Sequence, residues 1–406
     1  MLTYLKQFDR RLWVLAIGWI ASSVGFSISI PFLSLYFHST LGMSLTHIGL
    51  FFGFTAIIRS VFQSIGGELS DRFGRYHQMV YSQIIRSISF LVLAYAIYGD
   101  WGFRAIAVLI IFNSVFGALF QPAANATVAD LVGMDKRTEG YSIIRVAGNF
   151  GWALGPALGG FFAEQTYAVL FIISGGMTLI SSIIIALFLK GIKMDYISND
   201  KFQFGHIFQF KGYELIVHHA LLVFILYLVV SQFIAPFSLY SVDFMGITKK
   251  QLGFLFTLNG LMVTFLQLPI TRLLRSVRLS IQMLLGSVIY AVAYIIIGAT
   301  ATFMAFAIGI AVLTIGENFI SPPALAITAN LAPPGRIGRF MGIYGFSVTA
   351  GWSLGPLLGG LLLDLAKPDF IYSWGFVSIL ALVAAAGFGN LTRRIPKSLN
   401  LRQPHQ

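Results

Sequence analysis

The chain has 406 residues, of which 57% are hydrophobic and only 10% are charged. Soluble proteins usually carry about 25% charged residues, so this composition excludes a soluble globular protein and indicates that lipid surrounds most of the chain. The lack of cysteine excludes disulfides and thiol chemistry.

Twelve apolar segments follow one another along the chain, and each is long enough to cross a hydrocarbon core of about 30 Å as a helix. The first is too long for a signal peptide and lacks a small-residue cleavage site, so we expect it to remain as a membrane span. Irregular backbone cannot satisfy its hydrogen bonds in lipid, so each segment is predicted to be an α-helix. The segments cover residues 12–37, 45–67, 78–98, 103–131, 139–163, 167–189, 215–240, 249–271, 279–298, 302–331, 337–364 and 370–391.

Most of the 27 lysine and arginine residues fall between these segments on one side, the side that both chain ends share. The positive-inside rule then predicts that both termini are cytoplasmic. The formal net charge of +12 therefore indicates topology and contact with anionic lipid headgroups, and we expect no nucleic-acid partner.

The least apolar interior stretch, 190–214, follows the sixth segment. It predicts a cytoplasmic linker at 191–214 between two domains, an N-terminal six-helix bundle at 1–190 and a C-terminal six-helix bundle at 215–406. The other connections are short, so consecutive helices are expected to pack as antiparallel neighbours.

A ten-residue motif in the fifth segment, Gly151–Gly160, returns in the eleventh as Gly351–Gly360. The same offset relates residues upstream of it, which predicts two similar halves, as in membrane transporters with internal repeats. Glycines at every fourth position allow close helix packing, and a proline can bend its helix. The motif predicts either a point of flexing or a packing ridge, formed by Gly151, Gly155, Pro156 and Gly159 and by Gly351, Gly355, Pro356 and Gly359.

A charged motif, Gly67–Arg75, lies between the second and third segments. Its aspartate can sit at the positive N-terminus of a neighbouring helix, its arginines can bridge to acidic groups or helix carbonyl ends, and its glycines permit tight turns. We predict a breakable cytoplasmic latch, with simple anchoring at the headgroups as the alternative. The residues of this candidate gate are Gly67, Asp71, Arg72, Gly74 and Arg75.

With twelve helices, a repeat of six plus six, a central linker and these two motifs, the whole chain resembles the major facilitator superfamily. The charged motif fits the loop signature of that superfamily, and the glycine-proline motif fits a signature common in its proton-coupled drug exporters. The resemblance implies an all-α integral membrane protein in which twelve transmembrane helices form two pseudo-symmetric six-helix bundles. It also implies a monomer in the bacterial inner membrane.

Ionisable residues inside the spans are functional candidates, because each costs roughly 3 kcal/mol or more at mid-bilayer. Glu317 is the only acid near the centre of a predicted span. Because a poorly hydrated carboxyl group readily takes up a proton, we expect it to carry the coupling proton or to bind a cationic substrate. A structural carboxyl or a fixed salt bridge is the alternative. Arg145 and Arg59 are candidates for binding an anionic substrate, and Arg86 is expected to be structural, for example by pairing with Asp71.

Polar side chains add to this candidate site. The resemblance implies that the first, fourth, seventh and tenth spans line a central cavity. Asn113 stands where many drug exporters carry an arginine, so their proton relay is not carried over. An apolar pocket with scattered hydrogen-bonding groups suits amphipathic organic compounds better than a sugar. The polar candidates are Asn113, Gln121, Tyr227, Gln232 and Asn318.

These observations predict a secondary active transporter, a proton-coupled exporter of amphipathic small molecules of the multidrug type that works by alternating access. An organic-anion or phosphorylated-metabolite carrier is the alternative, and a non-transporting membrane receptor or scaffold is a third possibility. The sequence has no nucleotide-binding loop, metal-ligand cluster or nucleophile-base-acid set, so we expect no enzyme activity and no cofactor beyond the proton gradient. The expected partners are a small-molecule substrate, protons and membrane lipids.

Overall fold

The computed structural model describes residues 7–29, 33, 36–43, 45–163, 166–190, 212–366 and 368–401. Every regular element within these ranges is a helix, which confirms the all-α prediction. Residues 191–211, most of the predicted linker, lie outside the described part of the chain.

The first half of the chain contains six long helices, one in each of the first six predicted spans. Polar caps start two of them: the side chain of Asp9 accepts a hydrogen bond from the first turn of one, and that of Thr166 does so for another. The helices are α2 (Arg10–Ser27), α4 (Leu45–Phe73), α5 (Arg75–Tyr98), α6 (Gly102–Leu131), α7 (Arg137–Ala163) and α8 (Tyr167–Phe188), with short helical turns at η1 (Tyr36–Thr40) and η2 (Met134–Lys136).

The second half repeats this order, and its first span is broken into several helical pieces. There α10 (Glu214–Val230) gives way to η3 (Ser231–Phe233), α11 (Ala235–Leu239) and η4 (Tyr240–Phe244). Pro236 explains the break, because proline cannot donate the hydrogen bond that would continue the helix. The others are α12 (Lys249–Leu273), η5 (Leu274–Ser276), α13 (Leu279–Gly298), α14 (Phe303–Leu331), α15 (Ile337–Leu365), α16 (Ile371–Arg394) and α17 (Lys397–Asn400).

Ten helices in the described residues are long and apolar enough to cross a membrane by length and composition. Two predicted spans, α2 and α7, are helical but less apolar. Arg10 and Arg11 lower the hydropathy of α2, and polar residues such as Arg145 and Asn149 lower that of α7. The helices therefore agree with an integral membrane protein of twelve spans.

Two predicted boundaries are wrong. The first span was expected to run over 12–37, but α2 ends at Ser27, and residues 30–32, 34 and 35 of that span lie outside the described part of the chain. The charged motif Gly67–Arg75 was expected to form a loop, but α4 continues through Phe73 and α5 starts at Arg75. Gly74 alone separates them, with a φ of 86° that glycine adopts without steric strain.

The described chain divides into two compact units. Unit 1 comprises Met1–Gly133, Ile143–Phe208 and Pro333–Gly345, and unit 2 comprises Met134–Ser142, Gln209–Ala332 and Phe346–Gln406. The units follow the two halves of the chain except at α7 and α15, whose first turns belong to the other unit. The linker and the domain boundaries near 190 and 215 stay predictions.

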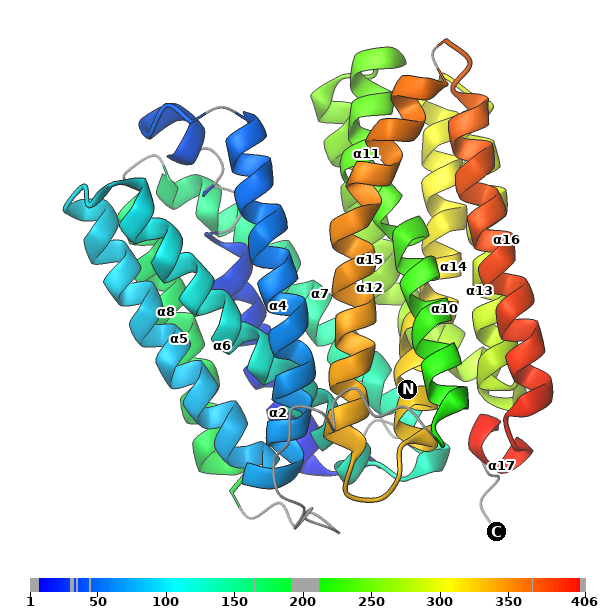
Figure 1. The fold of residues 1–406 in the computed structure, drawn as a ribbon, viewed down its shortest axis with the longest axis horizontal. Helices are drawn as coiled ribbons and strands as arrows, with labels where there is room; N and C mark the ends of the chain where they lie inside the picture. The colour runs from blue at the N-terminus through cyan, green and yellow to red at the C-terminus, as the bar shows by residue number, and fades with distance from the viewer. Residues whose placement is uncertain are drawn as a thin grey trace. The chain divides into compact units, whose positions relative to one another are not determined.

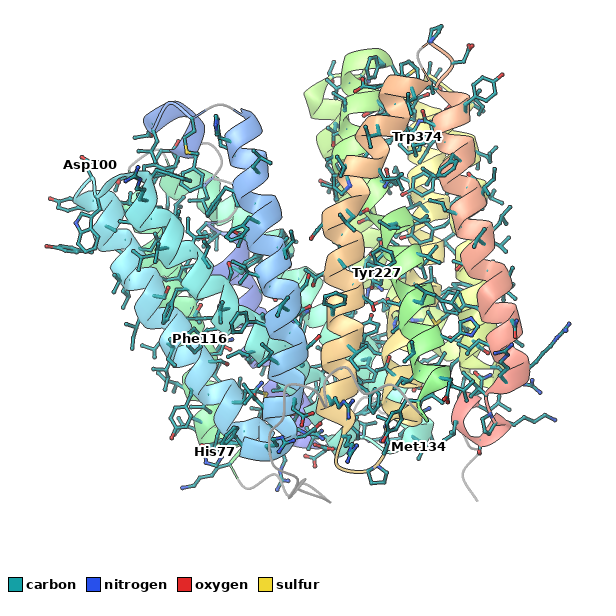
Figure 2. The ribbon with its side chains drawn as sticks, viewed as in Figure 1. His77, Asp100, Phe116, Met134, Tyr227 and Trp374 are labelled. Carbon is teal, nitrogen blue, oxygen red and sulfur yellow. The ribbon has the colours of Figure 1, made fainter. Side chains whose placement is uncertain are left out.

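The same helix pairs pack within each unit, which extends the sequence repeat to the structure (Figure 1). In unit 1, α5 packs on α6 and α8, α4 packs on α6, and α2 packs on α8. In unit 2, α13 packs on α14 and α16, α12 packs on α14, and α10 packs on α16. In Figure 2, His77 and Asp100 mark the two ends of α5, and Tyr227 lies between the ends of unit 2 that Met134 and Trp374 mark.

Candidate functional site

The centre of the candidate gate is Asp71, which is 2% exposed near the end of α4. Its Oδ1 accepts the backbone N–H of Gly338 at 2.9 Å, and its Oδ2 accepts that of Arg339 at 2.7 Å. Both donors belong to the first turn of α15, where backbone N–H groups lack partners within the helix. The carboxylate therefore caps the positive end of α15 inside unit 1.

Glycines set the close approach of α4 and α15. A Cβ atom on Gly67 would collide with the backbone of Gly338, and one on Gly342 would meet the backbone of α4. A Cβ on Gly338 would meet the carboxylate of Asp71. Gly67 was predicted to permit a turn, and this role is wrong, because the residue lies inside α4 and serves close packing instead. Gly74 does form the turn.

Arg75 holds Asp71 in place from the first turn of α5. Its Nη2 lies 3.4 Å from Oδ1 of Asp71, and its Nη1 pairs with Asp130 on α6. The same Nη1 donates to the carbonyl oxygen of Ala126 at 2.5 Å. The side chain is almost fully buried, so this ion-pair chain fixes the carboxylate that caps α15.

Arg72 plays a more local part. It pairs with Glu68, one turn earlier on α4, at 2.5 Å. Sequence reasoning named neither Glu68 nor Asp130 as a site residue. Glu68 stands inside the charged motif, but the contact of Asp130 joins residues far apart in sequence, so no local pattern shows it.

The glycine-proline motif packs α7 on α2 in unit 1. A Cβ on Gly151 would clash with Ser23, and one on Gly155 would clash with Ser27. The hydroxyl of Ser27 donates to the carbonyl oxygen of Gly151 at 3.2 Å. Gly159 is also buried, and the side chain of Pro156 lies outside the described part of the chain.

The second copy of the motif packs α15 on the first helix of its own half in unit 2. A Cβ on Gly351 would clash with Tyr227, one on Gly355 with Ser231, and one on Gly359 with Gln232. Gln232 donates to the carbonyl oxygen of Gly355 at 2.8 Å. Pro356 lies inside α15. Both copies thus form packing ridges, while the flexing that the prolines predict stays a prediction.

Glu317 lies on α14 of unit 2, half-buried, in a small polar cluster. The amide of Asn259 on α12 donates to Oε2 of Glu317 at 3.0 Å and to Oγ1 of Thr314 at 2.9 Å. Asn318 is 2% exposed, and neither polar atom of its side chain has a hydrogen-bond partner in the structure. Sequence reasoning missed Asn259, since its span was not among those expected to line a cavity.

Two of the predicted polar residues join helices of unit 1. The amide of Asn113 on α6 donates to the carbonyl oxygen of Arg86 at 3.1 Å. Gln121 accepts a hydrogen bond from Gln63 of α4 at 2.9 Å. Arg145 is half-buried on α7. Asn113 and Gln121 therefore make contacts that hold helices of unit 1 together.

Arg59 and Arg86 lie against one aromatic ring in unit 1. Their guanidinium carbons are 5.5 and 5.9 Å from the ring centre of Phe26. The predicted pairing of Arg86 with Asp71 does not form. Arg86 instead donates to Gln83 at 3.1 Å, because it lies three turns along α5 from the end that Asp71 faces.

Comparisons with known proteins agree with this architecture. The sequence profile of the Major Facilitator Superfamily matches residues 15–273 and 219–405. The uncharacterized MFS-type transporter YttB of Bacillus subtilis is 28% identical over 87% of this chain and 89% of its own length. The quinolone resistance protein NorA of Staphylococcus aureus is 21% identical over 92% and 95%. The crystal structure of the human organic anion transporter MFSD10 superposes with a TM-score of 0.79, at 17% identity over 93% of this chain and 98% of that one. The chain belongs to the Major Facilitator Superfamily of membrane transporters.

Proposed function

We propose that this transporter is a proton-coupled exporter of amphipathic small molecules and that Glu317 carries the coupling proton. The observation that supports this most directly is the pairing of Glu317 with Asn259. A carboxamide carries both a donor and an acceptor, so by rotating it can bond to a carboxylate or to a protonated carboxyl group. A lysine or arginine partner would stabilise the charged state alone.

A partner that serves both states suits a carboxyl group that must gain and lose a proton in each cycle. The hydroxyl of Thr314 accepts a hydrogen bond from the same amide of Asn259 and donates its own hydrogen to the carbonyl oxygen of Ile310. Neutralising the carboxylate lowers the cost of enclosing it away from water. Protonation of Glu317 would thereby permit an occluded state that the charged form disfavours.

The cap on α15 supplies a candidate gate for the same cycle. We propose that the contact of Asp71 with Gly338 and Arg339 breaks and reforms as the transporter alternates between states. A carboxylate cap contributes only about 1–2 kcal/mol, so the contact is weak enough to open during turnover.

The relative NorA supports drug export as the cargo class, because its name assigns it to quinolone resistance. Organic-anion carriage is the second candidate. The two arginines on Phe26 favour it, and the fold neighbour MFSD10 is called an organic anion transporter. We further propose that the protein is a monomer in a bacterial inner membrane with both termini in the cytoplasm.

Substrate-dependent proton flux tests this function. Purified protein would be reconstituted into vesicles with a pH-sensitive dye inside, and amphipathic cations, neutral compounds and anions would be added in turn. Proton movement that requires both protein and compound is expected. Transport without any proton movement would contradict proton coupling, and the absence of transport across all three classes would contradict the export function.

A further inference from the structure

Two positive charges converge inside unit 1, and the described residues place no negative charge beside them. Arg59 on α4 and Arg86 on α5 approach the same ring, Phe26 of α2, and lie close enough to interact electrostatically. Among the described residues, the salt bridges involve other arginines, and no carboxylate acts on either guanidinium group.

The pair also has unused hydrogen-bond donors. The Nε atoms of both arginines are buried and have no acceptor. The acceptors of Arg86 are the neutral side chains of Gln83 at 3.1 Å and Ser22 at 3.5 Å. Buried charges in proteins are normally paired with an opposite charge, and buried donors normally have acceptors. A bound anion would meet both requirements.

The two arginines differ in access. Arg86 is 5% exposed, and its guanidinium group fills the space beside Gly117 of α6. Arg59 is only partly buried. Ile57 and Val61, two exposed apolar residues of α4, lie about half a turn around the helix from Arg59. Arg59 therefore points away from this apolar face, toward Phe26, and is the member of the pair that a ligand can reach.

We propose that Arg59 binds the carboxylate of amphipathic organic anions, with Arg86 behind it supplying a second positive charge. This inference rests on the proposed export function and names the class of substrate. The planar guanidinium fork matches the two oxygens of a carboxylate. Phe26 is partly buried, lies against both guanidinium groups and offers apolar surface to the body of the same molecule.

The test compares three probes that share one apolar body: pyrenebutyrate, its neutral amide and the corresponding trimethylammonium cation. Binding of each to the purified, full-length protein would be followed by pyrene fluorescence. The wild-type protein is expected to bind the carboxylate at least about tenfold more tightly than the amide, the effect expected of one charge-assisted hydrogen bond. Equal binding of the carboxylate and the amide would overturn the proposal without any variant.

Variants then assign the effect to the pair. Arg59→Gln should abolish the preference for the carboxylate and leave binding of the amide unchanged, while Arg59→Lys should keep part of it. Arg86→Gln should reduce the preference less. Arg104→Gln is the matched control, because Arg104 is exposed at the start of α6 and should change nothing. A full preference in a folded Arg59→Gln protein, as judged by gel filtration, would contradict the assignment.

The outcomes separate this inference from the proposed function. Proton-coupled transport of the amide or the cation, without any preference for the carboxylate, would refute the anion site and leave the export function intact. A carboxylate preference that depends on Arg59, without proton movement, would support the anion site and contradict proton coupling.

Discussion

Replacing Asp71 with asparagine should release the first turn of α15 from α4. In the wild-type protein, two charged oxygens accept backbone N–H groups at 2.9 and 2.7 Å, and the residue is 2% exposed, so water screens these bonds little. Asparagine keeps one acceptor oxygen but turns an NH2 group toward the second N–H. The lost bond to a charged acceptor should cost about 1–2 kcal/mol, which raises the population of the released state roughly 5- to 30-fold.

A cysteine at Ser70 reports this release. Ser70 is fully buried where a side chain on Gly338 would touch it, and the natural chain contains no cysteine. We expect a maleimide reagent to label Ser70→Cys at least about fivefold faster when Asp71→Asn is also present. Glu68→Gln is the matched control, because it removes a charge from the same motif, and the salt bridge of Glu68 in the described part of the chain is to Arg72 of its own helix. Equal labelling rates in the two backgrounds would refute the capping argument.

Three further predictions concern packing and topology. Gly67→Ala should slow transport strongly, because its Cβ would meet the backbone of Gly338. Gly53→Ala on the same helix should not slow transport, because a Cβ there meets nothing within 4 Å. Equal transport rates of the two variants would refute the close approach of α4 and α15. Gly355→Leu should lower the thermal stability of the purified protein by clashing with Ser231, whereas Gly360→Leu has open space; equal melting temperatures would contradict the packing ridge. Met134 and Tyr372 are both exposed, and Met134 lies on the side of the membrane that carries most of the lysine and arginine residues. Met134→Cys should therefore react with a membrane-impermeant reagent only from the cytoplasm, and Tyr372→Cys only from outside. Reaction of Met134→Cys in intact cells would reverse the predicted topology.

The sequence predicted the helices well because, in lipid, the residues of a segment alone determine whether it forms a helix. A continuous apolar run of sufficient length must be helical, and most of the predicted spans start and end close to the observed helices. Helix boundaries were mispredicted where a single residue sets the point at which a helix ends. Gly74 interrupts α4 and α5 for one residue only, and Pro236 breaks the seventh span.

Contacts between distant residues could be predicted only in part. The helix dipole suggested that Asp71 would meet a helix N-terminus, but no pattern named α15 as the partner. The predicted pairing of Arg86 with Asp71 failed because Arg86 lies three turns along α5 from the end that Asp71 faces. Asn259 and Asp130 were missed because their partners come from other helices, and a single sequence does not record distances between helices.

The most direct test of the central claim is proton-coupled transport by Glu317→Gln in reconstituted vesicles. The amide keeps the shape of the side chain and its contact with Asn259 but cannot titrate. Transport driven by a pH gradient should collapse, while substrate exchange without a gradient survives in part. Asp369→Asn, which removes an exposed acid, should behave like the wild type. Full gradient-driven transport by Glu317→Gln, with an unchanged dependence on pH, would contradict the assignment of the coupling proton to Glu317.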